Sequence, residues 1–190
     1  MSFTYLKNPQ QISTYITEHI VNKKKVIRVE ILNEPEIREI EGRNVAYVSY
    51  VGNYLGNTGV FEELFGKLCG WAGPKQLMEK DTVMMSAYYD DPGVTPPEEL
   101  KLDVCITIDD DVEVEGEIKK KKLPGGKYVV MRTELTGPEE YAPTWEKVVE
   151  WMMENNLDID MSRASYELYL NSPDEHPQKH HIVDIFMPAK

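Results

Sequence analysis

The sequence predicts an α+β fold: two copies of one strand–helix–strand–strand module, joined in an antiparallel sheet with helices on one face, plus a short N-terminal helix. Three observations carry this prediction. The composition is that of a globular chain, with 190 residues, 41% hydrophobic residues and a net charge of −12. The chain resembles itself when it is shifted by 81 residues. Both copies show the same order of strand-like and helix-like segments.

The N-terminal helix is expected ahead of the repeat, within an appendage at residues 1–33. Asn8 and Pro9 are of the residue types that cap a helix and begin its first turn. Apolar residues then recur at helical spacing, at Ile12, Tyr15, Ile16 and Ile20. The helix should end near Asn22, before three consecutive lysines.

The internal repeat divides residues 34–190 into copies at 34–108 and 115–188. At the 81-residue shift, five well-separated residues coincide: Gly56 with Gly137, Tyr88 with Tyr169, Pro92 with Pro173, Pro96 with Pro177, and Asp103 with Asp184. The acidic run at 109–116 separates the copies and is expected to be a solvated linker and strand end. Its spacing lacks the pattern of a calcium-binding EF-hand loop. Neither copy can cover both faces of its own sheet, so one pseudo-symmetric domain is expected.

Each copy begins with a strand rich in β-branched and aromatic residues, at 45–51 and at 127–132. A helix follows, which in copy two should begin at Pro138. The apolar helix stripes are Val60, Phe61, Leu64, Leu68 and Trp71 in copy one, and Tyr141, Trp145, Val148, Val149 and Met152 in copy two. Two strands close each copy, at 82–89 and 101–108, and at 164–170 and 182–187.

Composition excludes several classes of protein. No stretch approaches the roughly 20 apolar residues that span a bilayer, and no signal sequence is expected. The acidity argues against direct binding of nucleic acid and favours cationic small molecules. Cys69 and Cys105 are expected to be buried free thiols, which suggests a reducing cytoplasm. No phosphate loop or nucleophile motif is present, so no cofactor is expected.

Three histidines, His176, His180 and His181, lie close together in a proline-flanked turn. His176 and His180 have the spacing of a ligand pair. Neither has a cysteine or a clear acidic partner nearby in the sequence. We therefore expect a surface loop and no metal site.

The copies differ at one position that could carry chemistry. Ser86 of copy one corresponds to Glu167 of copy two, in the middle of a predicted strand. Because side chains alternate along a strand, Glu167 shares a face with Tyr169, and Ser86 should lie beside it. Two interpretations are open. The carboxylate pairs with Arg132 or Arg163 or reaches solvent at a sheet edge, or it lies at the bottom of a pocket and receives a ligand cation.

Aromatic residues support the pocket interpretation, since tyrosine and tryptophan faces attract desolvated cations. The alternative for Trp145 and Trp71 is that both are core residues of their helices. The candidate ligand-binding residues are Glu167, Tyr169, Trp145, Tyr141, Tyr88, Ser86, Tyr50 and Trp71.

These residues resemble a known family. The segment from Tyr166 to Pro173, the strand from Val183 to Pro188 and the entry at Gly125 are similar to the GyrI-like small-molecule-binding domain, the effector-binding part of AraC-type and MerR-type multidrug regulators. The resemblance covers about residues 34–188. It implies that Glu167 lies at the pocket floor and meets lipophilic cations, with Tyr169 as lining. It brings no DNA-binding half.

The leading hypothesis is a stand-alone binding protein for lipophilic, cationic small molecules. The first alternative, implied by the resemblance, is a hydrolase of strained cyclopropane-bearing toxins, with Glu167 as general base and a tyrosine polarising the leaving group. The second is an interaction protein that protects gyrase or works with a separate regulatory or DNA-binding protein. No membrane partner is expected.

Overall fold

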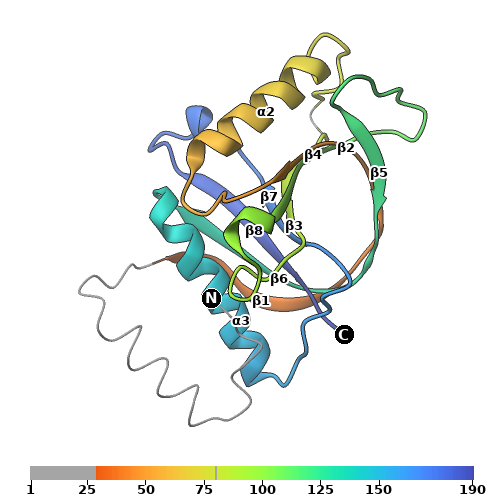
Figure 1. Ribbon diagram of the computed structural model, residues 1–190. Helices are drawn as coiled ribbons and strands as arrows, with labels where there is room; N and C mark the ends of the chain where they lie inside the picture. Colours follow the sequence, from red (N-terminus) through yellow and green to blue (C-terminus); the bar gives the residue numbers. More distant parts are fainter. Residues whose placement is uncertain (1–28, 80) are drawn as a thin grey trace.

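Eight strands form one antiparallel sheet in the order β1-β6-β8-β7-β3-β4-β2-β5. The computed structural model describes residues 29–79 and 81–190 (Figure 1), so the helix expected near residues 9–22 lies outside the described residues. The strands are β1 (Glu30–Ile40), β2 (Arg43–Val51), β3 (Met84–Tyr88), β4 (Lys101–Thr107), β5 (Lys119–Leu123), β6 (Gly126–Leu135), β7 (Ser165–Tyr169) and β8 (His181–Pro188). The described helices are α2 (Thr58–Ala72) and α3 (Tyr141–Glu154), with short 3₁₀ turns at η1 (Pro97–Glu99), η2 (Pro138–Glu140) and η3 (Pro173–Glu175).

The predicted α+β fold is confirmed, with the order β2-α2-β3-β4 repeated as β6-α3-β7-β8. The copies meet where β3 pairs with β7 at the middle of the sheet. In that pair Ser86 lies directly opposite Glu167. These two residues are also equivalent in the repeat, so the pseudo-two-fold axis of the molecule passes between them.

The leading strand of each copy joins the other copy. Strand β1 pairs with β6, and strand β5 pairs with β2. The sequence predicted neither strand. Residues 30–33 belong to β1, so the sheet begins before the predicted boundary at residue 34. The lysine-rich segment after the acidic run forms β5.

Both helices lie on the outer side of the curved sheet (Figure 1). Helix α2 packs on β2 and β4, and α3 packs on β6 and β8. Helix α3 begins at Tyr141, after a 3₁₀ turn at the predicted start Pro138. The buried helix residues are Leu64, Leu68 and Ala72 in α2, and Thr144, Val148, Val149 and Met152 in α3. In the sheet, the central strands β3 and β7 lie between the strands that α2 covers and those that α3 covers. The site described below is on these two strands.

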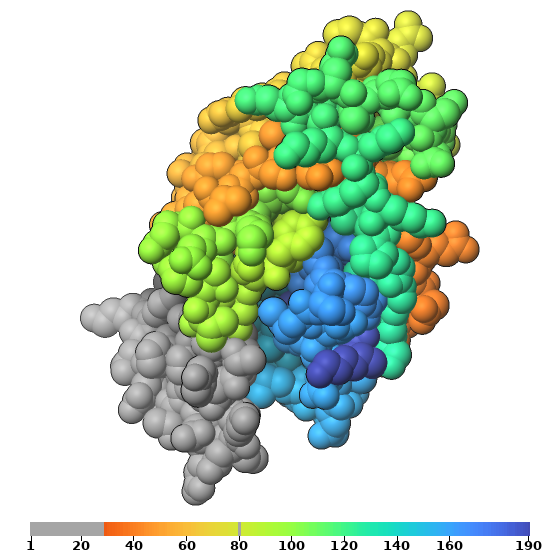
Figure 2. Space-filling view, turned by 45° about the vertical axis from the view of Figure 1, so that its right-hand side comes forward, coloured from red at the N-terminus to blue at the C-terminus, as the bar shows by residue number. Residues whose placement is uncertain are grey.

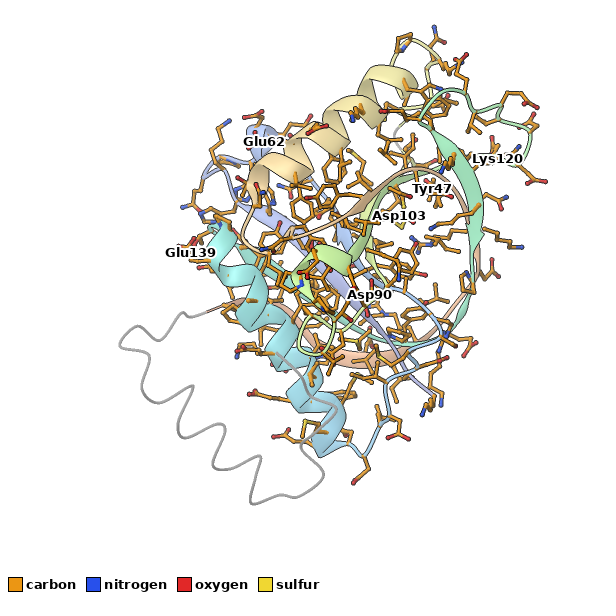
Figure 3. The ribbon with its side chains drawn as sticks, viewed as in Figure 1. Tyr47, Glu62, Asp90, Asp103, Lys120 and Glu139 are labelled. Carbon is orange, nitrogen blue, oxygen red and sulfur yellow. The ribbon has the colours of Figure 1, made fainter. Side chains whose placement is uncertain are left out.

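The inner face of the sheet holds a second core around Tyr128, Tyr166 and Phe186. Asp103 and Tyr47 lie inside the curve (Figure 3), and the ammonium group of Lys121 lies 4.2 Å from the centre of the Tyr47 ring. Asp103 pairs with Lys121, and its repeat mate Asp184 pairs with Arg132. Both buried aspartates of this face therefore have cationic partners.

Two close approaches complete the curved sheet. A Cβ at Gly125 would lie 2.3 Å from the carbonyl oxygen of Ile40, so the β1–β2 and β5–β6 turns touch at a position that requires glycine. The segment after α3 lies against the end of β8 (Figure 2), where Ile159 bridges Ala189. Cys69 and Cys105 are unbonded, but only Cys105 is fully buried. In the described part of the chain, no helix has the length and apolarity to cross a membrane.

Candidate ligand-binding site

Glu167 lies in the middle of β7 with only 4% of its surface exposed. Its Oε1 accepts a hydrogen bond from the indole nitrogen of Trp145 at 2.7 Å. Its Oε2 accepts two more, from the hydroxyls of Tyr88 at 2.7 Å and Tyr169 at 2.9 Å. Three neutral side chains thus satisfy a carboxylate that has almost no contact with water.

The two tyrosines are repeat mates, one from each copy. They lie on either side of the pseudo-two-fold axis and converge on the same oxygen of Glu167. The Tyr169 hydroxyl lies 2.8 Å from the oxygen of Ser86. Because the Tyr169 proton is donated to the carboxylate, the Ser86 hydroxyl donates to Tyr169. Five of the eight predicted residues, Ser86, Tyr88, Trp145, Glu167 and Tyr169, therefore form one hydrogen-bonded network.

Glu167 differs from the other buried carboxylates of the described chain. Asp103 and Asp184 each pair with a cation, and Glu140 accepts hydrogen bonds from the backbone N–H and the hydroxyl of Thr136 at the start of α3. Within residues 29–79 and 81–190, no lysine, arginine or histidine lies within 4.0 Å of Glu167. An isolated buried charge is costly, because hydrogen bonds replace only part of its hydration.

The pairing alternatives considered from the sequence are wrong. Arg132 forms a two-pronged ion pair with Asp184, at 2.7 and 2.8 Å. Arg163 pairs with Asp160 and donates to the backbone carbonyls of Gly125, Lys127 and Ala189. Solvent at a sheet edge is also excluded, because β7 is paired on both sides, by β3 and β8.

Burial dominates the electrostatics of this site. It raises the pKa of the Glu167 carboxyl above its usual range, and the hydrogen bonds from Trp145, Tyr88 and Tyr169 offset part of that rise. Burial also raises the pKa values of Tyr88 and Tyr169 well above 10, and the nearby Glu167 charge adds to the effect. The tyrosines are therefore neutral hydrogen-bond donors at physiological pH.

Aromatic side chains surround this network from both copies. The Tyr88 ring packs edge-on against Trp145, with centroids 5.8 Å apart, and lies 5.6 Å from Tyr54. Phe65 of α2 packs edge-on against Tyr169 at 5.5 Å. Tyr54 and Phe65 were not predicted. Tyr54 is in a loop without periodicity, and Phe65 is one residue away from the predicted stripe of its helix.

Tyr141 lies at the margin of the network. Its hydroxyl is 2.6 Å from Nδ1 of His181. Burial raises the pKa of Tyr141, and the charge of Glu167 makes a smaller contribution. Tyr141 therefore interacts with the carboxylate electrostatically and does not hydrogen-bond to it. His181 also lies beside Tyr169, with ring centroids 6.4 Å apart. The sequence singled out His181 only as part of a histidine turn.

The remaining two candidates lie elsewhere in the α2 half of the molecule. Tyr50 and Trp71 each pack against the buried cluster between α2 and the sheet. Trp71 follows Phe65 by six residues, about 9 Å along the helix axis. Its indole nitrogen is buried without a hydrogen-bond partner among the described residues, and Lys75 lies over its ring. Neither residue takes part in the Glu167 network.

The site is closed by its own side chains. A small cavity lies on the opposite, inner face of the sheet, near Met85, Leu168 and Phe186, and its volume of about 10 Å³ is close to that of a single water site. Sites for drug-sized molecules measure hundreds of Å³. Glu167 is 4% exposed, and its oxygens are covered by Trp145, Tyr88 and Tyr169, so access of such a molecule to the carboxylate requires these side chains to move.

Comparison with known proteins agrees with this architecture. Residues 33–190 match the GyrI-like small molecule binding domain. The match covers most of the chain, which therefore belongs to this family of small-molecule-binding domains.

Individual relatives carry different roles. The chain is 27% identical to the DNA gyrase inhibitor of Escherichia coli (strain K12) over 141 residues, covering 72% of this chain and 85% of the inhibitor. It superimposes on EcmrR, solved in a complex with DNA, with a TM-score of 0.68, 14% identity, and coverage of 95% of this chain and 63% of EcmrR. SAV2435, solved with bound tetraphenylphosphonium, gives a TM-score of 0.55 and 14% identity over 83% of this chain and 94% of that one.

Proposed function

We propose that this protein binds lipophilic cations between its two repeat copies, with Glu167 as the counter-charge. The observation that carries the proposal is a buried carboxylate held only by neutral donors. The two buried aspartates of the described chain, Asp103 and Asp184, are already neutralised by Lys121 and Arg132. A ligand cation would supply for Glu167 what these side chains supply for the aspartates.

The surroundings favour a bulky, apolar cation over a small hydrated one. Aromatic rings of Tyr54, Tyr88, Phe65 and Trp145 lie around the network. Each cation–π contact contributes about 0.5–2 kcal/mol once water is excluded. A metal ion or a primary ammonium would lose its hydration shell without enough oxygen ligands in return. A delocalised or shielded cation loses less and gains aromatic contacts.

Binding requires the closed network to open. We propose that the ligand enters between α2 and α3, where Phe65 and Trp145 reach the central strands from opposite sides. Displacing Trp145 breaks its hydrogen bond to Glu167, and the cation takes over the stabilisation of that oxygen. Part of the binding free energy is then spent on opening, which favours ligands with large apolar surfaces. SAV2435, which shares this fold, is known with a lipophilic cation of this kind.

Titration with tetraphenylphosphonium tests the proposal. We expect saturable binding by calorimetry, with quenching of tryptophan fluorescence as Trp145 changes its surroundings. Glu167→Gln keeps the side-chain shape and removes the charge, and should weaken binding at least tenfold. Glu139→Gln removes the same charge from an exposed position at the start of α3 (Figure 3) and should change affinity less than twofold. Equal affinity of the two variants would rule out the electrostatic role.

A neutral ligand separates charge recognition from apolar burial. Triphenylphosphine oxide is aromatic and uncharged, so its affinity should be lower than that of tetraphenylphosphonium for the unmutated chain. The difference between the two ligands should shrink in Glu167→Gln. If the neutral compound binds the unmutated chain as tightly as the cation, the site recognises shape alone.

The other functions considered from the sequence have distinct readouts. A carboxyl of raised pKa beside two tyrosine hydroxyls is also an arrangement for general acid–base catalysis. Mass spectrometry after incubation with a cyclopropane-bearing electrophile would detect a water adduct if the protein is a hydrolase. A role resembling the gyrase inhibitor or EcmrR would instead require a protein or DNA-binding partner, detectable by gyrase inhibition or by pull-down.

A further inference from the structure

Two histidines and a glutamate meet at the end of the sheet that carries the η3 loop. Glu134 of β6 lies 2.6 Å through Oε1 from Nδ1 of His180, and 3.8 Å from Nε2 of His176. The two imidazole rings are stacked, with centroids 5.2 Å apart and an angle of 17° between their planes. One ligand atom from each of the three residues lies within 4.8 Å of the others. No sequence pattern points to the acidic member, which lies more than 40 residues before the histidines.

The loop presents these side chains in a defined arrangement. The Asn171 side chain donates to the carbonyl oxygen of His180 at 2.9 Å and accepts from the N–H of Ile182 at 2.7 Å. In the β6–β8 pair, Ile182 lies opposite Glu134. The Asn171 side chain thus fixes the backbone from His180 to Ile182, and the strand register places this segment beside Glu134. Lys179 is paired with Asp174, so it does not compete for the Glu134 carboxylate.

The donor set matches a transition-metal ion. Two imidazole nitrogens and one carboxylate oxygen are ligands of catalytic and accessory zinc sites, whereas calcium and magnesium prefer oxygen alone. Ligand atoms about 2.0 Å from a tetrahedral metal lie about 3.3 Å from one another. The Glu134–His180 distance of 2.6 Å would have to open, and the Glu134–His176 distance of 3.8 Å to close, by well under 1 Å each. The ligand atoms of the two histidines, which lie within 4.8 Å of each other, must also approach to about 3.3 Å.

The side chains are also reachable. Those of Glu134, His176 and His180 are each about one-fifth exposed, at 18%, 21% and 20%. This leaves a route for the ion and for a water in the fourth position. Within the described chain, Glu134 has no lysine or arginine partner that the ion would have to displace.

We propose that Glu134, His176 and His180 form a binding site for a divalent transition-metal ion of the Zn²⁺ class, which links the η3 loop to β6. The ion replaces the proton that His180 shares with Glu134. Nδ1 of His176 accepts two backbone N–H groups at 3.3 Å, from Gln178 and His180, so the ring proton is on Nε2. When Nε2 binds the metal, this proton moves to Nδ1 and both accepted hydrogen bonds are lost, while the Nδ1 proton of His180 is released to solvent. These exchanges make the site weaker than a preformed structural zinc site.

Titration of the untagged 190-residue chain tests this proposal. After metals are removed with a chelator, ZnCl₂ is titrated in by calorimetry, and CoCl₂ is followed by its visible absorption. We expect one equivalent of Zn²⁺ to bind, a tetrahedral Co²⁺ spectrum, and an increase in melting temperature with zinc concentration. His176→Ala, His180→Ala and Glu134→Gln should each weaken binding at least tenfold.

The matched control is Glu175→Gln, which removes an exposed carboxylate of the same loop that lies outside the cluster and leaves the Lys179–Asp174 pair in place. Its affinity should equal that of the unmutated chain. Glu134→Gln retains size and hydrogen bonding, so a loss of binding in this variant with an unchanged circular dichroism spectrum reports the ligand itself. Absence of saturable uptake by the unmutated chain, or equal uptake by His180→Ala, overturns the proposal.

Discussion

At the scale of single residues, one substitution on a symmetry axis separates the two copies. Ser86 and Glu167 occupy equivalent, directly opposed positions, and Tyr88 and Tyr169 flank them as repeat mates. Two glutamates at this axis would place like charges side by side in a buried space. Serine on one side instead donates to Tyr169 and thereby supports the hydrogen bond that Tyr169 makes to the carboxylate. The asymmetry allows a single charge to receive donors from both copies.

Glu167 should lower the stability of the ligand-free protein at neutral pH. Its pKa is raised by folding, so the folded protein holds a proton at pH values where the unfolded chain has already lost it. Stability therefore falls as pH rises from the ordinary carboxyl pKa through the raised value. Glu167→Gln lacks this loss and should be more stable at neutral pH by roughly 1 kcal/mol, or about 2–4 °C in melting temperature.

Urea unfolding of both proteins across this pH range measures the effect. The stability difference should disappear at pH values below the ordinary carboxyl pKa, where both side chains are neutral. Glu139→Gln controls for the change in net charge. A glutamine variant less stable than the unmutated chain at every pH would mean that the hydrogen bonds outweigh the burial of the charge.

Sequence patterns predicted the centre of the site better than its margin. Strand alternation placed Glu167 and Tyr169 on one face, and the repeat placed Ser86 and Tyr88 beside them, because both rules follow from backbone geometry. Tyr54 and Phe65 depend on how a loop and a helix settle on the sheet, which no local pattern records. Trp71 has the residue type of a ligand contact but lies about 9 Å along α2 from Phe65, outside the Glu167 network.

At the scale of elements, sequence patterns did not predict the two edge strands, β1 and β5, each of which pairs with a strand of the other copy. Strand β5 contains four consecutive lysines, and β1 alternates charged and apolar residues on an exposed edge, so neither has the apolar character of a buried strand. The inner strands were predicted closely because both of their faces are covered. Strand β5 is recognised by its tertiary contacts: it pairs with β2, and Lys121 extends into the inner face of the sheet to Asp103.

Lys121 should anchor β5 to the sheet. It pairs with Asp103 and lies between the rings of Tyr47 and Tyr89, at 4.2 and 4.6 Å. Lys121→Met would leave Asp103 buried with only two hydroxyl donors, Ser49 and Tyr89. Because the lysine side chain is 28% exposed, a moderate loss of about 1–3 kcal/mol in the free energy of unfolding is expected.

Chemical denaturation within a double-mutant cycle checks this prediction. Asp103→Asn removes the charge that Lys121 compensates, so the methionine substitution should cost much less in that background. Lys119→Met, at an exposed position of the same strand, should change stability by less than about 0.5 kcal/mol. Equal losses for both lysine variants would show that Asp103 does not depend on Lys121.

At the scale of the whole molecule, the chain has a net charge of −12, and the buried acids of the described residues are individually neutralised or hydrogen-bonded. The charge therefore draws cations toward the protein in general, and Glu167 is the position where one would be held. Charge composition alone identifies neither the residue nor the site.

Because the leading strands are exchanged, we expect the two copies to depend on each other for folding. Strand β1 has its partner, β6, in copy two, and β5 has its partner, β2, in copy one. Fragments 1–113 and 114–190, divided within the acidic run, would each expose the central edge at β3 or β7 and leave one strand unpaired. Unpaired edges and half-covered cores do not support a cooperative fold.

Each fragment alone should show no cooperative thermal transition by circular dichroism, whereas an equimolar mixture should regain one and elute as a single 1:1 complex on gel filtration. A cooperative transition in either isolated fragment would mean that the ancestral module is still a folding unit, and that the strand exchange adds stability without being required.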